Sequence, residues 1–249
     1  MFEAQWIRGG TRPLECTGVD NNDPTRIPTL MDALQRVWEG QPDLSLSALL
    51  GTLRNRGAEW GTSDEEVLEI LGMMESEHPS LVRWPPETPM TVDTTSPEQR
   101  VTINGADVVV RPGGRDLRMP SAWNASHFRA VGPGRSLVIT DLEGIEHRLG
   151  VVTLVHAMDA DEAPELTGLE QPDIGSARWF VGFEDGARAI VGQRITLWRP
   201  EGRRATTHET YKFARILACA EGAEMKIAPA GGGEPVPLGR VARVVLVDL

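Results

Sequence analysis

Cysteine is nearly absent from this chain of 249 residues, which contains only Cys16 and Cys219. Two cysteines so far apart in the sequence do not form a disulfide framework, and neither belongs to a spacing that binds zinc. A disulfide-rich secreted domain and a zinc finger are therefore excluded. We expect idle or buried thiols in a reducing, cytoplasmic environment.

Long apolar runs are lacking as well. No window of the sequence approaches the roughly 18 consecutive apolar residues that a membrane-spanning helix needs. The first ten residues, MFEAQWIRGG, lack the basic region and apolar core of a signal peptide. The sequence therefore predicts a soluble protein without a membrane partner.

Basic residues are too few to balance the acids: 25 Lys and Arg stand against 36 Asp and Glu, for a net charge of −11. The excess is concentrated in residues 1–80, which hold fourteen acids and six Lys or Arg. An acidic chain is repelled by phosphate backbones and by anionic lipids, so nucleic acid is a poor default partner.

The motifs of catalysis and cofactor binding are missing too. There is no G-x-S-x-G elbow, no Walker loop and no dinucleotide fingerprint after a strand. His147 and His156 are nine residues apart, which puts them on opposite faces of one strand and argues against a shared metal. The acidic segment 159–170 lacks the spaced ligands of a calcium loop. No catalytic residue, cofactor or metal site is predicted. The sequence therefore favours a non-catalytic protein over an enzyme.

Three short amphipathic helices are predicted within residues 25–80, where apolar residues recur at helical spacing. Ser45 is a cap for the second helix, and Ser63 with Glu66 has the spacing of a capping box for the third. Gly40 and Gly57 mark the ends of the first two helices. Helices this short are not stable alone, so the three must share one core.

This segment resembles a small helical module of uncharacterised bacterial proteins. The resemblance implies a fold and no chemistry. It is carried by Leu34, Trp38, Pro42-Asp43-Leu44, Leu49-Leu50 and Asp64-Glu65-Glu66. A helix-turn-helix would place those last acids at the DNA, where a reading helix needs Arg, Lys, Asn or Gln.

The remainder of the chain divides at segments rich in turn and proline residues. The expected parts are an N-terminal arm (1–24), the three-helix module (25–80), a Pro-rich linker (81–99), β unit 1 (100–160) and β unit 2 (175–249). In β unit 1, Met119–Phe128 is expected to be a loop or a helical turn. In β unit 2, residues 199–207 are expected to form a polar loop, and Tyr211–Cys219 fits helix and strand equally well.

Self-similarity relates the two β units, because residues 137–159 return as 225–248. Leu149-Gly150 falls on Leu238-Gly239, and each copy ends in an aspartate, Asp159 or Asp248. Such a repeat indicates one supersecondary unit used twice. The fold class predicted is therefore α+β, with an N-terminal three-helix module followed by two related small β-barrel-like units.

The repeated piece is similar to the central hairpin of PRC-barrel domains, in which a turn glycine precedes a Leu-Gly kink and a long strand ending in Asp. Here these positions are Gly144, Leu149-Gly150 and Asp159 in one copy, and Gly233, Leu238-Gly239 and Asp248 in the other. The resemblance implies an adaptor barrel that binds protein or RNA partners. The negative charge of this chain argues against RNA.

One basic cluster stands out, formed by Arg199, Arg203 and Arg204 on the expected loop. It is a candidate ligand-binding site for an anion or an acidic partner. The function favoured is a non-catalytic binding or scaffolding protein that acts through a protein partner or as a homo-oligomer. Two alternatives remain open: an enzyme with a site between the two β units, and a nucleic-acid-associated regulator.

Overall fold

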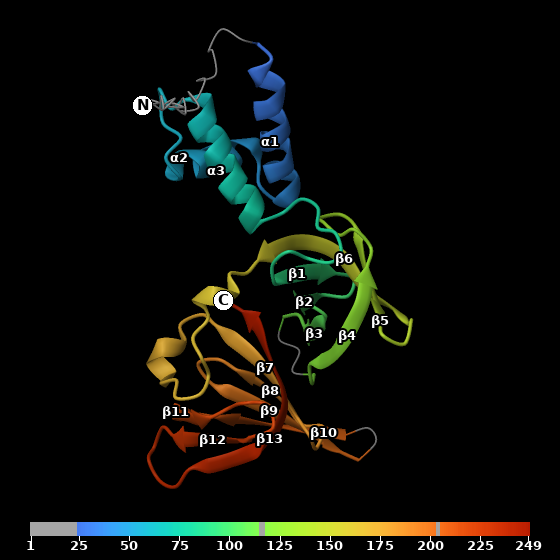
Figure 1. Cartoon of the computed structure of the whole chain (residues 1–249), viewed down its shortest axis with the longest axis vertical. Helices are drawn as coiled ribbons and strands as arrows, with labels where there is room; N and C mark the ends of the chain where they lie inside the picture. Colours follow the sequence, from blue (N-terminus) through green and yellow to red (C-terminus); the bar gives the residue numbers. More distant parts are fainter. Residues whose placement is uncertain (1–23, 115–117, 203–204) are drawn as a thin grey trace, which may run out of the picture.

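The computed structural model describes residues 24–114, 118–202 and 205–249. It has three parts in chain order, with a helical module at the top of Figure 1, a closed barrel below it and a curled sheet at the bottom. The α+β class and the two barrel-like units are therefore confirmed. Residues 1–23 of the predicted arm, and both Arg203 and Arg204, lie outside the described residues.

The module begins with α1 (Arg26–Gly40), continues with α2 (Leu46–Asn55) and ends with α3 (Asp64–Glu77). Its caps are those that the sequence predicts. The Ser45 hydroxyl accepts a hydrogen bond from the amide of Ala48, and Ser63 and Glu66 form a reciprocal capping box. The three helices share one core, made of Ala33, Val37, Leu49, Leu53, Ile70, Leu71 and Met74.

The first β unit is a closed six-stranded antiparallel barrel in which each strand pairs with the next and β1 pairs with β6. Its strands are β1 (Met90–Thr95), β2 (Gln99–Asn104), β3 (Asp107–Pro112), β4 (Ser121–Phe128), β5 (Ser136–Asp141) and β6 (Glu146–Ala157).

Strand β1 lies inside the segment predicted as a linker, so that prediction is wrong for Met90–Thr95. The apolar pattern of a buried strand is weak in this segment, because its buried positions include two threonines, Thr91 and Thr94, beside Met90 and Val92. Its polar composition resembles a linker, while its backbone closes the barrel between β2 and β6.

The segment Met119–Phe128 is also corrected, since it forms strand β4 rather than a loop or helical turn. A register shift between Ala125 and His127 interrupts the alternation of buried and exposed side chains. The period-two signal of a strand is lost at such a bulge.

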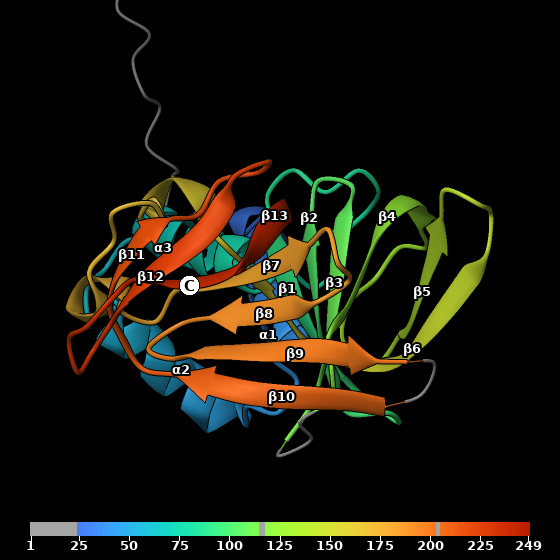
Figure 2. The same cartoon turned by 90° about the horizontal axis from the view of Figure 1, so that it is seen from below.

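The second β unit is a curled seven-stranded sheet in the order β10-β9-β8-β7-β13-β12-β11. Figure 2 shows β13, β7, β8, β9 and β10 side by side in this order. The strands are β7 (Arg178–Phe183), β8 (Arg188–Val191), β9 (Ile195–Glu201), β10 (Ala205–Tyr211), β11 (Phe213–Ala218), β12 (Glu224–Pro229) and β13 (Val236–Asp248). Residues 199–207, expected to form a loop, instead belong largely to β9 and β10, and Tyr211–Cys219 is mainly strand.

The two β units repeat one another in hydrogen-bond detail. The amide of Gly134 donates to the carbonyl of Val152 over 2.8 Å, and the amide of Gly222 donates to that of Val241 over the same distance. Leu149 and Leu238 are both buried. Strand β6 shifts register against β1, and β13 shifts at the matching place against β7. The predicted repeat is thus confirmed.

One strand distinguishes the units. In the barrel, β3 pairs with β4 and closes the ring, whereas in the second unit β9 pairs with the additional strand β10. The ring of the second unit therefore stays open between β10 and β11. The outer edge of β11 is partly covered, because Ile216 exchanges backbone hydrogen bonds with Gly168 and Leu169.

The two β units pack against each other through apolar side chains on the outer faces of their strands. Val109 of β3 meets Phe180 of β7 and Val245 and Val247 of β13 in one buried cluster. Neighbouring side chains on these strands face the unit's own core, because successive side chains of a strand alternate. Strands apolar on both faces are therefore sandwiched between two cores.

A histidine pair joins the helical module to the barrel. His78, at the end of α3, lies 3.1 Å by its Nδ1 from the carbonyl oxygen of Val155 on β6. Its ring centroid is 5.0 Å from that of His156. Burial, and then the neighbouring His78, lower the pKa of His156 below its usual value, while Glu77 and Asp248 oppose this shift.

We expect Gly150→Ala to destabilise the barrel more than Gly144→Ala. Both glycines have positive φ, so alanine costs about 1 kcal/mol at either position. At Gly150 a Cβ would also lie 2.6 Å from the carbonyl oxygen of Thr95, whereas nothing lies within 4 Å at Gly144. This contact adds about 1–3 kcal/mol. Urea unfolding of the two variants measures the difference, and equal losses would contradict the close approach.

We expect the free energy of unfolding to fall as pH drops from about 7 to about 5.5. Since the folded state holds the pKa of His156 below the usual value of about 6.5, the unfolded state binds the proton more readily in this range. Urea unfolding at several pH values measures this. His156→Asn should flatten the dependence, while the control His208→Asn, on exposed strand β10, should leave it. A dependence unchanged in His156→Asn would contradict the assignment.

Candidate functional site

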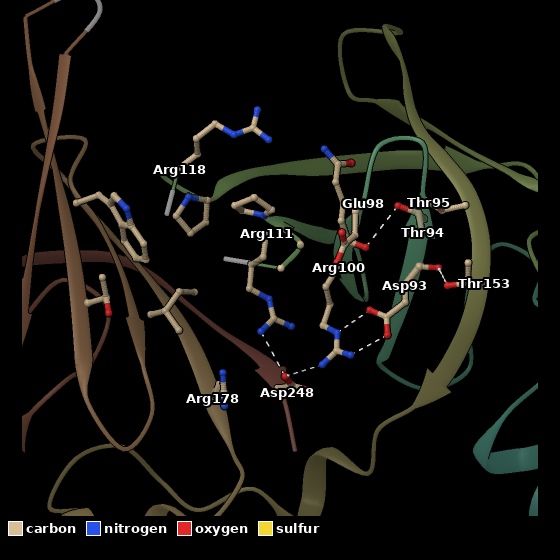
Figure 3. Close-up of a pocket in the computed structure, with 18 residues that line it drawn as sticks. Asp93, Thr94, Thr95, Glu98, Arg100, Arg111, Arg118, Thr153, Arg178 and Asp248 are labelled. Carbon is tan, nitrogen blue, oxygen red and sulfur yellow. Dashed lines mark hydrogen bonds and ion pairs between the residues drawn. The ribbon is translucent and has the colours of Figure 1, made fainter. Parts of the chain in front are cut away.

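A cleft of about 580 Å³ lies between the two β units and is lined mainly by polar side chains. Figure 3 shows residues of β1, β2 and β3 facing residues of the second unit across it. Arginine is the most frequent charged residue type in the described lining. The charged side chains are Asp93, Glu98, Arg100, Arg111, Arg118, Arg178 and Asp248.

Arg100 of β2 holds two carboxylates that come from different β units. Its guanidinium binds Asp93 of β1 in bidentate fashion, with Nε–Oδ1 and Nη2–Oδ2 distances of 2.6 and 2.7 Å. Its Nη1 donates to Oδ2 of Asp248, on β13, over 3.2 Å. Hydrogen bonding to Asp93 raises the pKa of Arg100 above its usual value, so its charge is permanent.

Arg111 and Thr102 fix the end of β13 against the barrel. Arg111 Nη2 and the buried Thr102 hydroxyl donate to the carbonyl oxygen of Val247 over 2.7 and 2.9 Å. Arg111 Nη1 also donates to Oδ2 of Asp248 over 3.4 Å. The last strand of the second unit is thus bonded to the outside of the first (Figure 3).

The electrostatics around Arg111 are unusual for an arginine. Its side chain is 12% exposed. Burial lowers its pKa below the usual value, and the neighbouring charges of Arg100 and Arg178 lower it further, against the attraction of Asp248. Among the residues that the structure describes, the charge of Arg111 is therefore only partly compensated.

The arrangement suits the binding of anions better than proton transfer. Both oxygens of Asp93 are bonded to Arg100, so this carboxylate is already engaged in an ion pair within the protein. Arginine cannot act as a base, because it stays protonated. Among the residues that the structure describes, no cluster of three or more His, Cys, Asp and Glu side chains has the arrangement of a metal site.

Of the predicted basic cluster, the structure describes Arg199, which lies on a strand and not on the expected loop. Arg199 lies on β9, where its Nη2 donates to the carbonyl oxygen of Leu238 over 2.9 Å and its Nη1 lies 3.4 Å from Oδ2 of Asp185. Its side chain therefore braces the second unit. The sequence prediction missed Arg100 and Arg111, which face each other on the paired strands β2 and β3.

His147, His156 and Cys219, the other residues considered as site candidates, lie in different surroundings. His147 lies by its Nε2 2.8 Å from Oδ2 of Asp141 and stacks near Trp123, whereas His156 meets His78. This separation agrees with their odd spacing. Cys219 is buried in the core of the second unit, as predicted, and burial raises its pKa to about 11.

A second candidate surface lies on the helical module. Seven of the twelve exposed large apolar side chains in the described chain belong to it, although the module makes up only about a quarter of the described residues. These are Ile27, Met31, Trp38, Leu46, Leu50, Trp60 and Met73, called here the module apolar surface. They lie on all three helices and on the connection between α2 and α3, and their number makes the module a candidate interaction surface.

No protein-family model matches this chain, and no curated protein or solved structure shows significant similarity to it. The resemblances to a bacterial helical module and to PRC barrels therefore remain predictions. None of the described helices has the length and apolar character required to cross a bilayer.

We expect Asp248→Asn to lower the free energy of unfolding by about 2–4 kcal/mol, because the amide leaves the buried Arg111 without its carboxylate. Asp185→Asn is the matched control. It removes the partner of Arg199 from a pair in which both side chains are more than 40% exposed, so it should cost about 0–1 kcal/mol. Urea unfolding compares them. Equal effects would show that the Asp248 contacts contribute little.

Proposed function

We propose that this protein is a non-catalytic binding or scaffolding protein of the cytoplasm that recruits a protein partner through its helical module. The observation that supports this is the module apolar surface. Large apolar side chains in water cost free energy that burial against a partner recovers, at roughly 25 cal/mol per Å².

The surface has the form of short helical stripes. Ile27 and Met31 are one turn apart on α1, and Leu46 and Leu50 are one turn apart on α2. Trp38 Nε1 donates to the carbonyl oxygen of Leu44 over 2.8 Å, which holds the indole beside the start of α2. Residues spaced by one turn share a helix face, which suits contact with an apolar groove or helix.

The charge of the module selects the kind of partner. Residues 24–80 hold ten acids and four arginines, and α3 opens with Asp64, Glu65 and Glu66. A partner with apolar residues flanked by Lys or Arg would match this surface in both respects. Nucleic acid would meet repulsion instead. A second copy of this acidic module would also be repelled, which favours a different protein over a homo-oligomer.

An enzyme with its site between the two β units is the second candidate, favoured by the cleft with its convergent polar side chains. The pairing of Asp93 with Arg100 leaves this candidate weaker. A ligand-binding role for the cleft is compatible with a scaffold, because the module and the cleft are separate surfaces.

The test is affinity capture from extract of the source cells with the full chain and two variants. Leu50→Glu places a charge on the module apolar surface, at a side chain 51% exposed. Leu142→Glu is the matched control, in the β5–β6 turn and 72% exposed. A partner should be retained by wild type and control, and its affinity for Leu50→Glu should fall at least about tenfold, the loss of one apolar contact.

Light scattering of the purified protein separates a homo-oligomer from a hetero-complex. The proposal fails if every captured protein binds Leu50→Glu as well as it binds the control, or if none binds wild type. Circular dichroism of both variants verifies that the helices remain formed.

A further inference from the structure

We propose that the cleft between the two β units binds a small organic anion, bearing a carboxylate or phosphate group, next to Arg111 and Arg178 and against Trp198. This inference is independent of the partner proposed for the helical module. It rests on the charged groups of the lining, on the incomplete pairing of Arg111 and Arg178 among the described residues, and on the chemistry of the wall beside them.

The lining reverses the charge of the chain. The whole protein carries a net charge of −11, whereas the described residues that line the cleft include four arginines and three acids. Two of the acids, Asp93 and Asp248, are already bonded to Arg100. A cleft of one sign concentrates ligands of the opposite sign, and its low-dielectric walls strengthen the field.

Two of these arginines, Arg111 and Arg178, are incompletely neutralised by the carboxylates that the structure describes. Asp248 offers the same oxygen, Oδ2, to Arg100 at 3.2 Å and to Arg111 at 3.4 Å, both longer than the 2.6 Å contact of Arg100 with Asp93. Arg178 is the β-sheet neighbour of Asp248, yet within the described part of the chain no carboxylate lies at ion-pair distance from it. A bound anion would therefore form charge-assisted hydrogen bonds with Arg111 and Arg178, whose charges the single carboxylate of Asp248 does not fully neutralise.

The wall next to these arginines suits the body of an organic molecule. Ile190, Thr196 and Trp198, from β8 and β9, line the side that belongs to the second unit, and Pro112 and Pro120 line the side that belongs to the barrel. Figure 3 shows Arg111, Arg118 and Arg178 around this part of the cleft. Apolar walls with a few placed polar groups are the ordinary composition of small-molecule sites.

Joining the two β units does not require this surplus of positive charge. The apolar cluster around Val109 and Phe180 already fixes the contact, and Thr102 and Arg111 bind the backbone of β13. Arg178 takes part in neither. A positive side chain that the joint does not use is available to a ligand.

The experiment titrates the full chain with two probes, citrate for carboxylate and inorganic pyrophosphate for phosphate, followed by calorimetry and by the NMR signal of the Trp198 indole. The variants are Arg178→Gln and, as the matched control, Arg148→Gln, an arginine 78% exposed on β6 and outside the cleft lining. We expect at least one probe to bind wild type and control and to shift the Trp198 signal. Affinity for Arg178→Gln should fall at least about tenfold, since a charge-assisted hydrogen bond is lost.

The probe that binds more tightly identifies the anionic group. The proposal is overturned if neither probe binds below about 10 mM, in the range weaker than ordinary ligand affinities. It is equally overturned if Arg178→Gln and Arg148→Gln bind as tightly as each other, because the anion would then bind the surface in general. Arg178 is exposed and makes no contact with Asp93 or Val247, so its variant should fold.

Discussion

The arrangement of this protein depends on how the end of strand β13 is held against the barrel. Its last residues are bonded twice over, by β7 within the second unit and by side chains of the first. The Thr102 hydroxyl and the Arg111 guanidinium reach the Val247 carbonyl, and Val245 and Val247 fill the apolar contact beside it. These contacts join the two β units along β13, and the cleft lies beside them, between the barrel and the second unit.

The same supersecondary unit performs two tasks in the molecule. In the first copy the ring closes through β3 and β4, which leaves a compact barrel that supports the helical module at one side and the second unit at another. In the second copy the additional strand β10 pairs with β9, and the ring stays open. One repeat thus provides a closed support, while the other provides the sheet whose β8 and β9 form a wall of the cleft.

Most of the fold can be predicted from the sequence. Helix caps and hairpin turns are local patterns, and the repeat is visible when two segments of the sequence are compared. Ser63 with Glu66 and Asn104-Gly105 each report a structure formed by near neighbours. Strand β1 could not be recognised, since its buried threonines are explained only by strands β2 and β6 that enclose it. The cleft was missed for a similar reason. Arg100 and Arg111 are paired across β2 and β3, but Asp248 is 137 or more residues away in the sequence and reaches them only because the two units dock. The basic cluster of Arg199, Arg203 and Arg204 is visible in the sequence because its members are close together in the chain.

The central claim is that the end of β13 joins the two β units into one body, which makes both the cleft and its charge possible. The most direct measurement is ¹⁵N relaxation of the backbone amides in the intact chain. The account expects one rotational correlation time for the barrel strands β1–β6 and the sheet strands β7–β13 alike. Separate and shorter correlation times for the two units would show that they move independently, and would contradict a fixed cleft between them.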